Sequence, residues 1–273
     1  MQVKNIMNIK MKLKVMLLIS LYLIELALTA VPKKIFIAGD STADSRGANN
    51  GATSGWGKFL GDYLTIPVYN HAVSGQSART FYRDGGWANL IKEVSQGDYV
   101  IIQFGHNDVG GPNSNPKGSA GGTGDETVTV ILNGVEEVVH TFPWYIRYFC
   151  NQVLEKGATP LLLSLTPNFS FVDGKVVEPS RFAGFMKLVS DELNIPFIDH
   201  YNYIARNWEF LGENFLKEHN WFPTDYKHTS PEAADFNAKM IISGIKCQKI
   251  EDLLAVLGDK ANYVNYPCYV TSE

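Results

Sequence analysis

The stretch KIFIAGDSTA, residues 34–43, decides the fold, because a short apolar run ends there in a glycine and small polar residues. Runs without hydrophobic alternation are typical of strands buried on both faces, as in a parallel sheet covered by helices. Further runs of this kind predict strands at residues 67–70, 99–104, 160–165 and 196–199.

Amphipathic segments separate these runs, and their periodicity is typical of helices. We expect helices at residues 56–64, 87–94, 142–156, 180–193, 203–216 and 230–246. The last segment begins Ser-Pro-Glu, which places a good N-cap before a proline at the first helical position. The alternation predicts a three-layer α/β/α sandwich, in which ligands bind at the carboxyl ends of the strands.

Two insertions interrupt this alternation. Residues 109–125 are rich in Gly, Ser, Asn and Pro, and they predict a long loop. The loop leads into residues 127–139, whose central Asn133-Gly134 is a strong signal for a two-residue hairpin turn. Asp173-Gly174 predicts a similar turn further along.

The N-terminus resembles a targeting segment. Four lysines within the first 14 residues precede a ten-residue stretch at 15–24, apolar except for Ser20, and small residues lead to Ala30. This pattern predicts a secretory signal peptide at 1–30, with an uncleaved anchor as the alternative. Ten apolar residues are too few for a permanent span, which takes ~20. We therefore expect a secreted, extracellular protein without stable membrane association, whose residues 31–273 form a single domain.

Charge and histidine spacing exclude several classes of protein. The net charge is −4, and the first 30 residues contribute +3, which leaves −7 for the rest. Without a dense Lys/Arg cluster, this part is a poor candidate for binding nucleic acid. No two of the six histidines lie within five residues of each other, so zinc spacings such as His-Glu-x-x-His are absent. The chain also lacks a Gly-x-Ser-x-Gly elbow.

The chain has three cysteines, Cys150, Cys247 and Cys268. An odd count outside the cell favours one disulfide and one leftover thiol. Pairing Cys247 with Cys268 would fasten the C-terminal tail, and the helical spacing around Cys150 favours a buried, inert thiol. Asn168-Phe-Ser is the only N-glycosylation sequon.

A serine follows the first predicted strand in the stretch GDSTA, residues 39–43. At the end of a buried strand, Ser41 exposes its hydroxyl above the sheet, and neighbouring N–H groups can face an anion. A helix cap is the more frequent role of such a serine.

Near the C-terminus, Asp225 and His228 lie three residues apart in DYKHTSP. On one turn, the carboxylate can reach one ring nitrogen and leave the other for a hydroxyl nucleophile. The alternative is an Asx-turn that leads into the final helix, with His228 as a surface residue.

Two further motifs supply what acyl transfer would still need. Gly75 follows the second predicted strand and Asn107 follows the third, in GHND. The N–H groups of Ser41 and Gly75 and the Asn107 amide are suitable donors for an oxyanion. A turn glycine and a loop cap are the alternatives for Gly75 and Asn107.

Together these motifs resemble the four signature blocks of the SGNH (GDSL) hydrolase superfamily. Within it, the chain looks most like the rhamnogalacturonan acetylesterases in the stretches NHAVSGQSART (70–80), GDYVIIQFGHND (97–108), TFPW (141–144) and FPTDYKHTSP (222–231). The match extends from about residue 35 to residue 247. Gln76 stands where an Arg is common, and the insertion at 109–139 does not align clearly, which leaves fine substrate preference open.

The resemblance implies a flavodoxin-like, five-stranded parallel sheet and a serine esterase without metal or organic cofactor. Ser41 would be the nucleophile, His228 its base and later its acid, and Asp225 the group that orients His228. Ser41, Gly75 and Asn107 would form the oxyanion hole. The two late cysteines look like a C-terminal disulfide of fungal members.

The implied activity is removal of acetyl groups from pectic rhamnogalacturonan, with acetylated plant cell-wall polysaccharide as the partner of a monomeric enzyme. Esterases of xylan, other acetylated glycans or lipids are alternatives, as is a catalytically silent carbohydrate-binding protein of the same fold. Five tryptophans could stack on sugar rings, with Trp221 the first candidate, but packing in the core or between helices is the favoured role of each. Arg79, Arg83 and Arg181 are candidates for binding an anionic substrate, each with a structural role as its alternative.

Overall fold

The computed structural model describes residues 11–12, 14–16, 33–46 and 51–269. Apart from the first two of these ranges, the expected signal peptide lies outside the described residues, and it stays a prediction. Among the described residues, no helix combines the length and the hydropathy that a membrane crossing requires.

A five-stranded, all-parallel sheet forms the centre of the molecule, with the strand order β2-β1-β3-β6-β9. The fold class expected from the sequence is therefore confirmed. The strands are β1 (Ile35–Gly39), β2 (Val68–Asn70), β3 (Tyr99–Gln103), β6 (Thr159–Leu163) and β9 (Phe197–Ile198).

Side chains of each central strand alternate between two hydrophobic clusters, one on each face of the sheet. In β1, Ile35 and Ile37 belong to one cluster, whereas Phe36 and Ala38 belong to the other. All four are at most 1% exposed. Because both faces are covered, every position of the strand is apolar, which explains the unbroken runs in the sequence.

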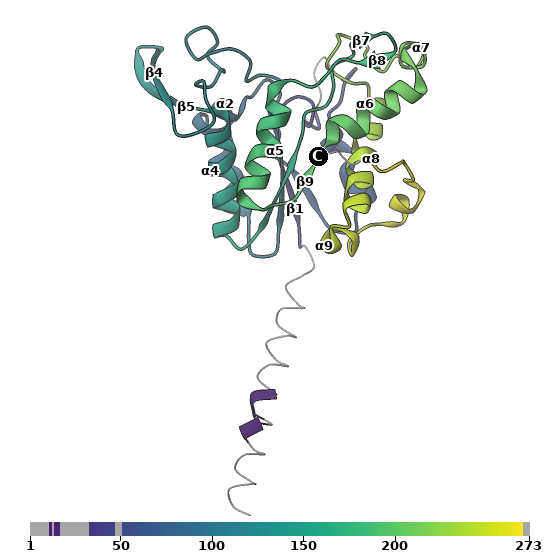
Figure 1. The fold of residues 1–273 in the computed structure, drawn as a ribbon, viewed down its shortest axis with the longest axis horizontal. Helices are drawn as coiled ribbons and strands as arrows, with labels where there is room; N and C mark the ends of the chain where they lie inside the picture. The colour runs from purple at the N-terminus through teal and green to yellow at the C-terminus, as the bar shows by residue number, and fades with distance from the viewer. Residues whose placement is uncertain (1–10, 13, 17–32, 47–50, 270–273) are drawn as a thin grey trace, which may run out of the picture.

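Helices cover both faces of the sheet, and Figure 1 shows α4 and α5 on one side and α6 and α8 on the other. The first layer contains α2 (Ala78–Arg83), α3 (Gly86–Glu93), α4 (Phe142–Glu155) and α5 (Arg181–Leu193). The second contains α6 (His200–Leu211), α7 (Glu213–Glu218), α8 (Pro231–Gln248), α9 (Glu251–Leu254), and the 3₁₀ helices η1 (Trp56–Lys58), η2 (Leu60–Tyr63) and η3 (Asp259–Tyr263).

Two hairpins lie above the carboxyl edge of the sheet, at the top of Figure 1. They are β4 (Thr127–Leu132) with β5 (Val135–His140), and β7 (Phe171–Val172) with β8 (Lys175–Val176). Asn133 and Gly134 have φ angles of 52° and 80°, and Asp173 and Gly174 have 50° and 75°. Positive φ at both central positions is what a type I′ turn requires, so both expected turns are present.

Residues 56–64, expected as one α-helix, form two short 3₁₀ helices instead. This segment packs closely against the loop that carries Ser41. A β-carbon on Gly55 would lie 2.4 Å from the backbone of Ala43, and one on Gly57 would lie 2.5 Å from the carbonyl oxygen of Ala43. This close approach is a tertiary constraint that local periodicity does not reveal.

Two other helix predictions were incomplete. The helix expected at 203–216 is divided into α6 and α7 at Gly212, whose φ of 86° ends the first helix. Helix α2 was not predicted, although Ser77 and Thr80 form a capping box at its start.

The C-terminal tail is fastened to α8 at its end. Cys247 and Cys268 form a disulfide, and the Lys246 ammonium donates to the carbonyls of Ala261 and Val264. Cys150 is fully buried, as expected, and burial raises the pKa of its thiol.

Candidate active site

Ser41, His228 and Asp225 form a hydrogen-bonded chain at the carboxyl edge of the sheet. Ser41 follows β1, and its Oγ lies 2.8 Å from His228 Nε2. On the other side of the ring, His228 Nδ1 lies 2.7 Å from Asp225 Oδ2. A carboxylate only accepts, so Nδ1 carries the proton and Nε2 is left to accept from the serine hydroxyl. The structure thus brings together three residues from distant parts of the chain.

Asp225 is held as a carboxylate. Burial by itself would raise its pKa, but hydrogen bonds from the His228 ring and from two backbone amides outweigh this effect and lower the pKa to about 2. The amides are those of Lys227 and His228, which donate to Asp225 Oδ1 at 2.7 and 2.8 Å. The Asx-turn considered as an alternative is therefore present, and it coexists with the ring contact.

The loop that carries His228 is fastened to the segment after Ser41. Ser54 N–H donates to the Thr229 carbonyl at 2.8 Å, and Thr229 Oγ1 donates to the Ser54 carbonyl at 3.0 Å. Ser230 then caps α8 by accepting from Ala233 N–H. These reciprocal bonds fix the distance between the imidazole and the serine hydroxyl.

The three expected oxyanion donors lie at the ends of three neighbouring strands. Gly75 has a φ of 80°, a conformation that favours glycine. Asn107 Nδ2 donates one hydrogen to the Gln76 carbonyl at 2.9 Å, which leaves its second hydrogen available. Within the described part of the chain, the amides of Ser41 and Gly75 make no hydrogen bond to protein acceptors. Among the described residues, the arrangement therefore leaves three N–H hydrogens without a protein acceptor, in loops that are joined to the one carrying Ser41.

We expect the Asn107→Ala variant to have a kcat for a small chromogenic acetyl ester about 10²–10³-fold below that of the wild type. The reason is that the amide would donate to negative charge that develops only in the transition state. Steady-state kinetics measure the effect, and thermal unfolding checks that the lost bond to Gln76 has not unfolded the loop. A change in KM with kcat preserved would contradict this role.

Three polar side chains connect the loops that carry the donors, and sequence reasoning assigned no role to them. Asp44 Oδ2 accepts from the backbone and hydroxyl of Ser74 at 2.9 and 2.8 Å. Asn70 Nδ2 donates to the Ala43 carbonyl at 2.7 Å. These two ties join the loop after β1 to the loop after β2.

The third tie joins the loops after β2 and β3. Asp108 Oδ1 accepts from Ala78 N–H at 2.9 Å, at the first residue of α2. Burial raises the pKa of Asp108 well above its ordinary value. Only its place in the GHND motif could have drawn attention to it, since its partner lies 30 residues away.

A buried polar network supports the loop that carries Ser41. Gln103 Oε1 accepts from Trp56 Nε1 at 2.7 Å, and its Nε2 donates to the Ser164 carbonyl at 2.6 Å. The same Nε2 lies 3.0 Å from His200 Nδ1, while His200 Nε2 lies 2.8 Å from the Asn237 carbonyl. Burial lowers the pKa of His200 to about 4, so this imidazole is neutral and donates through Nε2.

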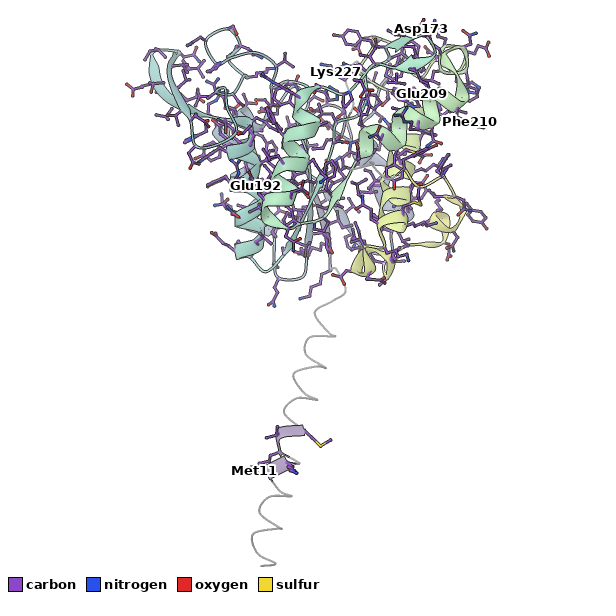
Figure 2. The ribbon with its side chains drawn as sticks, in the orientation of Figure 1. Met11, Asp173, Glu192, Glu209, Phe210 and Lys227 are labelled. Atoms are coloured by element: carbon purple, nitrogen blue, oxygen red, sulfur yellow. A yellow bond between two sulfur atoms is a disulfide. The ribbon has the colours of Figure 1, made fainter. Side chains whose placement is uncertain are left out.

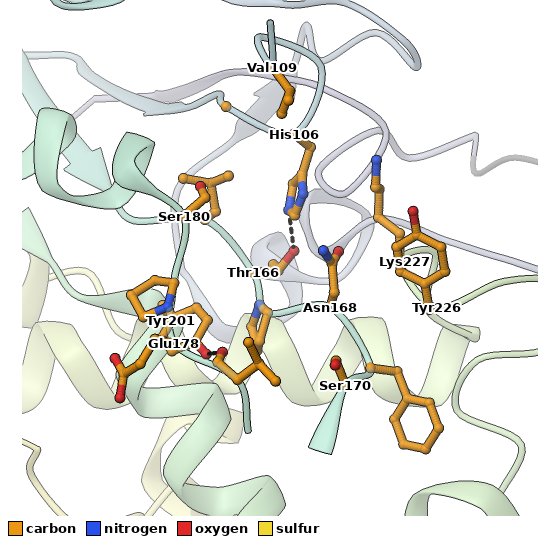
Figure 3. Close-up of a pocket in the computed structure, with 16 residues that line it drawn as sticks. His106, Val109, Thr166, Asn168, Ser170, Glu178, Ser180, Tyr201, Tyr226 and Lys227 are labelled. Carbon is orange, nitrogen blue, oxygen red and sulfur yellow. Dashed lines mark hydrogen bonds between the residues drawn. The ribbon is translucent and has the colours of Figure 1, made fainter. Parts of the chain in front are cut away.

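A cleft of about 560 Å³ lies next to the Ser41–His228–Asp225 triad, because residues that directly precede His228 and Asn107 in the chain line it. Figure 3 shows polar side chains facing it from several loops, including His106, Asn168 and Lys227. His106 Nε2 lies 3.1 Å from Thr166 Oγ1, and burial lowers the pKa of His106. The lining residues are Gly105, His106, Val109, Leu165, Thr166, Pro167, Asn168, Phe169, Ser170, Val177, Glu178, Pro179, Ser180, Tyr201, Tyr226 and Lys227. Asn168, the acceptor residue of the sequon, is thus part of the cleft wall.

The tryptophans do not line this cleft. Trp221, the first candidate for sugar contact, is 3% exposed and packs against Phe215 and Phe236, so it has the core role that was favoured for every tryptophan. Of the five tryptophans, only Trp144 is not fully buried, and it stacks on His140. Aromatic contact with a substrate would come from Tyr226, which is 60% exposed at the cleft.

The three arginines considered for an anionic substrate also lie elsewhere. Arg79 is fully buried in an ion pair with Glu137, and Arg83 pairs with Asp84. Arg181 lies over the ring of Phe182 and does not line the cleft. The described residues contain no group of three or more His, Cys, Asp or Glu side chains placed to hold a metal ion.

Several known proteins are similar to this chain in sequence. The profile of the GDSL-like lipase/acylhydrolase family matches residues 37–235. A rhamnogalacturonan acetylesterase of Emericella nidulans is 35% identical over 234 residues, which cover 85% of this chain and 92% of that protein. The rhamnogalacturonan acetylesterase RhgT of Bacillus subtilis is 27% identical over 231 residues, covering 79% of this chain and 90% of RhgT.

Solved structures share the fold at lower identity. The YxiM protein of Bacillus subtilis matches with a TM-score of 0.65 and 24% identity, over 81% of this chain and 58% of that one. The acetylxylan esterase Axe2 of Geobacillus stearothermophilus matches with a TM-score of 0.54 and 18% identity, over 79% of this chain and 94% of that one. At these identities the structural likeness establishes the architecture alone.

Proposed function

The chain belongs to the GDSL-like lipase/acylhydrolase family and is a carboxylic ester hydrolase, and we propose that it is a secreted serine esterase that removes acetyl groups from rhamnogalacturonan. The observation that carries the chemistry is the hydrogen-bonded chain from Ser41 through His228 to Asp225. The 35% identity to a rhamnogalacturonan acetylesterase supports the choice of substrate.

In the first half of the reaction, Ser41 Oγ attacks the acetyl carbonyl carbon while His228 Nε2 takes the hydroxyl proton. Asp225 stabilises the resulting imidazolium and keeps the ring in place. The carbonyl oxygen becomes an oxyanion, which accepts from Ser41 N–H, Gly75 N–H and the free Asn107 hydrogen. Collapse of this intermediate breaks the bond to the sugar oxygen, and His228 returns the proton to that oxygen. The acetyl group is then esterified to Ser41.

In the second half, water replaces the sugar. His228 takes a proton from the water as the hydroxyl adds to the acetyl carbonyl, and the same three donors hold the second oxyanion. The bond to Ser41 Oγ breaks, the serine recovers its proton from His228, and acetic acid leaves and ionises in solution. No electron acceptor or further reactant is needed.

The shape and chemistry of the cleft support a glycan substrate. It is open to solvent at about 560 Å³, and hydroxyl, amide and imidazole groups lie among apolar positions such as Leu165 and Pro167. Polar donors and acceptors of this kind match sugar hydroxyl groups. A fatty acyl chain needs a continuous apolar channel, which the polar groups in this lining would interrupt.

Acetate release from three substrates tests the proposal. We expect acetylated rhamnogalacturonan to be deacetylated with a higher kcat/KM than acetylated xylan, and a long-chain chromogenic ester to be turned over much more slowly. A higher kcat/KM on xylan would contradict the pectic substrate while leaving the esterase chemistry intact. Fastest turnover of the long-chain ester would favour a lipase instead.

The proposal also places the protein outside the cell, as a monomer. It rests on the lysine-rich start followed by an apolar stretch, and on the Cys247–Cys268 disulfide, since such bonds persist in oxidising compartments. N-terminal analysis of protein recovered from the culture medium tests it, because cleavage near Ala30 leaves a new N-terminus there. Sedimentation of the same material measures the oligomeric state.

A further inference from the structure

The cleft beside the triad carries one fixed charge of each sign. Among the described residues that line it, Lys227 is the only lysine or arginine and Glu178 is the only carboxylate. Figure 3 shows the two apart, with Lys227 beside Tyr226 and Glu178 beside Tyr201. Lys227 and His228 both act electrostatically on His106 in the cleft wall, so the positive charge lies at the end of the cleft nearest the catalytic imidazole.

Lys227 has no ionic partner within the described residues, in contrast to Arg79 and Arg83. Its backbone N–H is bound by Asp225 Oδ1 at 2.7 Å, which fixes where the side chain starts. The side chain is half-buried, and its charge acts on the imidazole of His106 across the cleft. Figure 2 places Lys227 above the carboxyl edge of the sheet. A positioned lysine without a protein carboxylate is available to an anion from outside.

A second lysine lies next to one of the expected oxyanion donors. The Lys117 ammonium is 3.4 Å from the place where a β-carbon on Gly75 would be, next to one of the oxyanion donors. Lys117 is half-buried as well, and within the described residues its ammonium has no carboxylate partner. Lys117 belongs to the long loop at residues 109–125. Within this loop, Asn115 Nδ2 donates to the Val109 carbonyl at 2.7 Å, which helps to fix its conformation.

We infer that Lys227, beside His228, and Lys117, beside Gly75, bind carboxylates of an anionic polysaccharide next to the acetylated sugar, and so make the enzyme select uronate-containing glycans over neutral ones. This inference rests on the proposed function, and it names the residues that would set its specificity. Apart from its first 30 residues the protein carries a net charge of −7, so long-range attraction does not bring a polyanion to it. Direct contacts with lysine side chains are needed instead, because a charge-assisted hydrogen bond to the carboxylate can offset this repulsion at short range.

The opposite charge of Glu178 gives the cleft a direction. A polyanion is attracted to the Lys227 end and repelled at the Glu178 end, so its uronate carboxylate binds near the triad. Two variants of nearly equal volume therefore have opposite expected effects. Lys227→Gln removes the attraction, whereas Glu178→Gln removes the repulsion. A change of cleft shape alone would not raise KM in one variant and lower it in the other.

The experiment measures KM and kcat on acetylated rhamnogalacturonan, acetylated xylan and a small neutral acetyl ester. We expect Lys227→Gln to raise KM on rhamnogalacturonan about 10-fold, because the variant loses roughly one charge-assisted hydrogen bond to the substrate. On the two neutral substrates, KM should change far less. Lys117→Gln should act in the same direction, and Glu178→Gln should lower KM on rhamnogalacturonan. Lys156→Gln is the matched control, because this exposed lysine lies at the far end of α4.

Salt gives a second readout that a merely structural role would not change. Raising the ionic strength should bring the KM values of the wild type and Lys227→Gln on rhamnogalacturonan closer together, because salt weakens the attraction that only the wild type has, while the overall repulsion changes equally in both. If the wild type prefers rhamnogalacturonan and Lys227→Gln retains that preference and its salt dependence, the inference is wrong while the proposed function stands. If the wild type prefers xylan, the proposed function itself fails. Equal losses on all three substrates would mean that Lys227 supports the fold of the His228 loop.

Discussion

The Ser41→Ala variant is expected to hydrolyse acetyl esters with a kcat on the order of 10⁴- to 10⁶-fold below that of the wild type. Within the described residues, Ser41 is the only hydroxyl that hydrogen bonds to His228, so no second nucleophile is available to that base. A chromogenic acetyl ester tests this directly. The wild type should release a rapid burst of chromophore as the acetyl-enzyme forms, and the variant should show no burst.

The control for this variant is Ser114→Ala, which removes an exposed hydroxyl bound only to the Gly111 carbonyl, and it should retain wild-type turnover. Thermal unfolding of Ser41→Ala should match the wild type, because the lost atom makes a single bond to His228. Equal and measurable rates for wild type and Ser41→Ala would place the nucleophile elsewhere. Equal rates at the level of the uncatalysed reaction would favour the silent carbohydrate-binding protein.

The Glu137→Ala variant is expected to lose about 3 kcal/mol of unfolding free energy. Glu137 on β5 accepts from Arg79 Nε and Nη2 at 2.8 and 2.6 Å, and the Arg79 side chain is fully buried on α2. Removing the carboxylate leaves a buried guanidinium whose remaining hydrogen-bond partner among the described residues is the Gly118 carbonyl. The pair also joins the β4–β5 hairpin to the helix that follows the Gly75 loop. Chemical denaturation monitored by fluorescence measures the loss.

Asp191→Ala serves as the control, since it breaks the exposed pair between Asp191 and Lys187 on α5 and should cost about 0.5 kcal/mol or less. The double variant Arg79→Met with Glu137→Leu should recover much of the lost stability, because no charge is then left buried. A Glu137→Ala variant as stable as Asp191→Ala would show that water solvates Arg79 when the hairpin shifts.

Local sequence patterns predicted the elements whose cause is local. The strand at residues 35–39 has apolar side chains on both faces, and the Asn133-Gly134 turn has two residues that readily adopt positive φ. Each signal lies within a few residues, so no knowledge of distant contacts is needed. The order of the strands was available only through the family resemblance.

The elements that were predicted wrongly depend on distant contacts. Residues 56–64 have helical spacing, but Gly55 and Gly57 lie against the backbone near Ala43, and a regular α-helix does not form there. Trp221 precedes the Asp225–His228 turn, which made it the first candidate for sugar contact, but its ring faces the core, the role that was favoured for every tryptophan. Position in the sequence does not determine which way a side chain points.

The candidate site divides in the same way. The sequence motifs identified Ser41, Asn107 and His228, because each stands at the end of a strand or beside a helix cap. The motifs did not identify the residues that join the loops, because Asp44 and Asp108 each bind a partner 30 residues away. A carboxylate in a loop has many possible uses, and only the assembled fold selects one of them.

The position of Asn168 in the cleft wall has a consequence for how the enzyme is produced. Asn168-Phe-Ser is an acceptor for oligosaccharyltransferase, and its side chain is exposed. In a yeast or insect-cell host, the transferred oligosaccharide would stand where the polymer has to enter, while a small synthetic ester could still pass. Protein from a bacterial cytoplasm would lack this obstruction. Two preparations with one amino-acid sequence would then differ in their apparent substrate range.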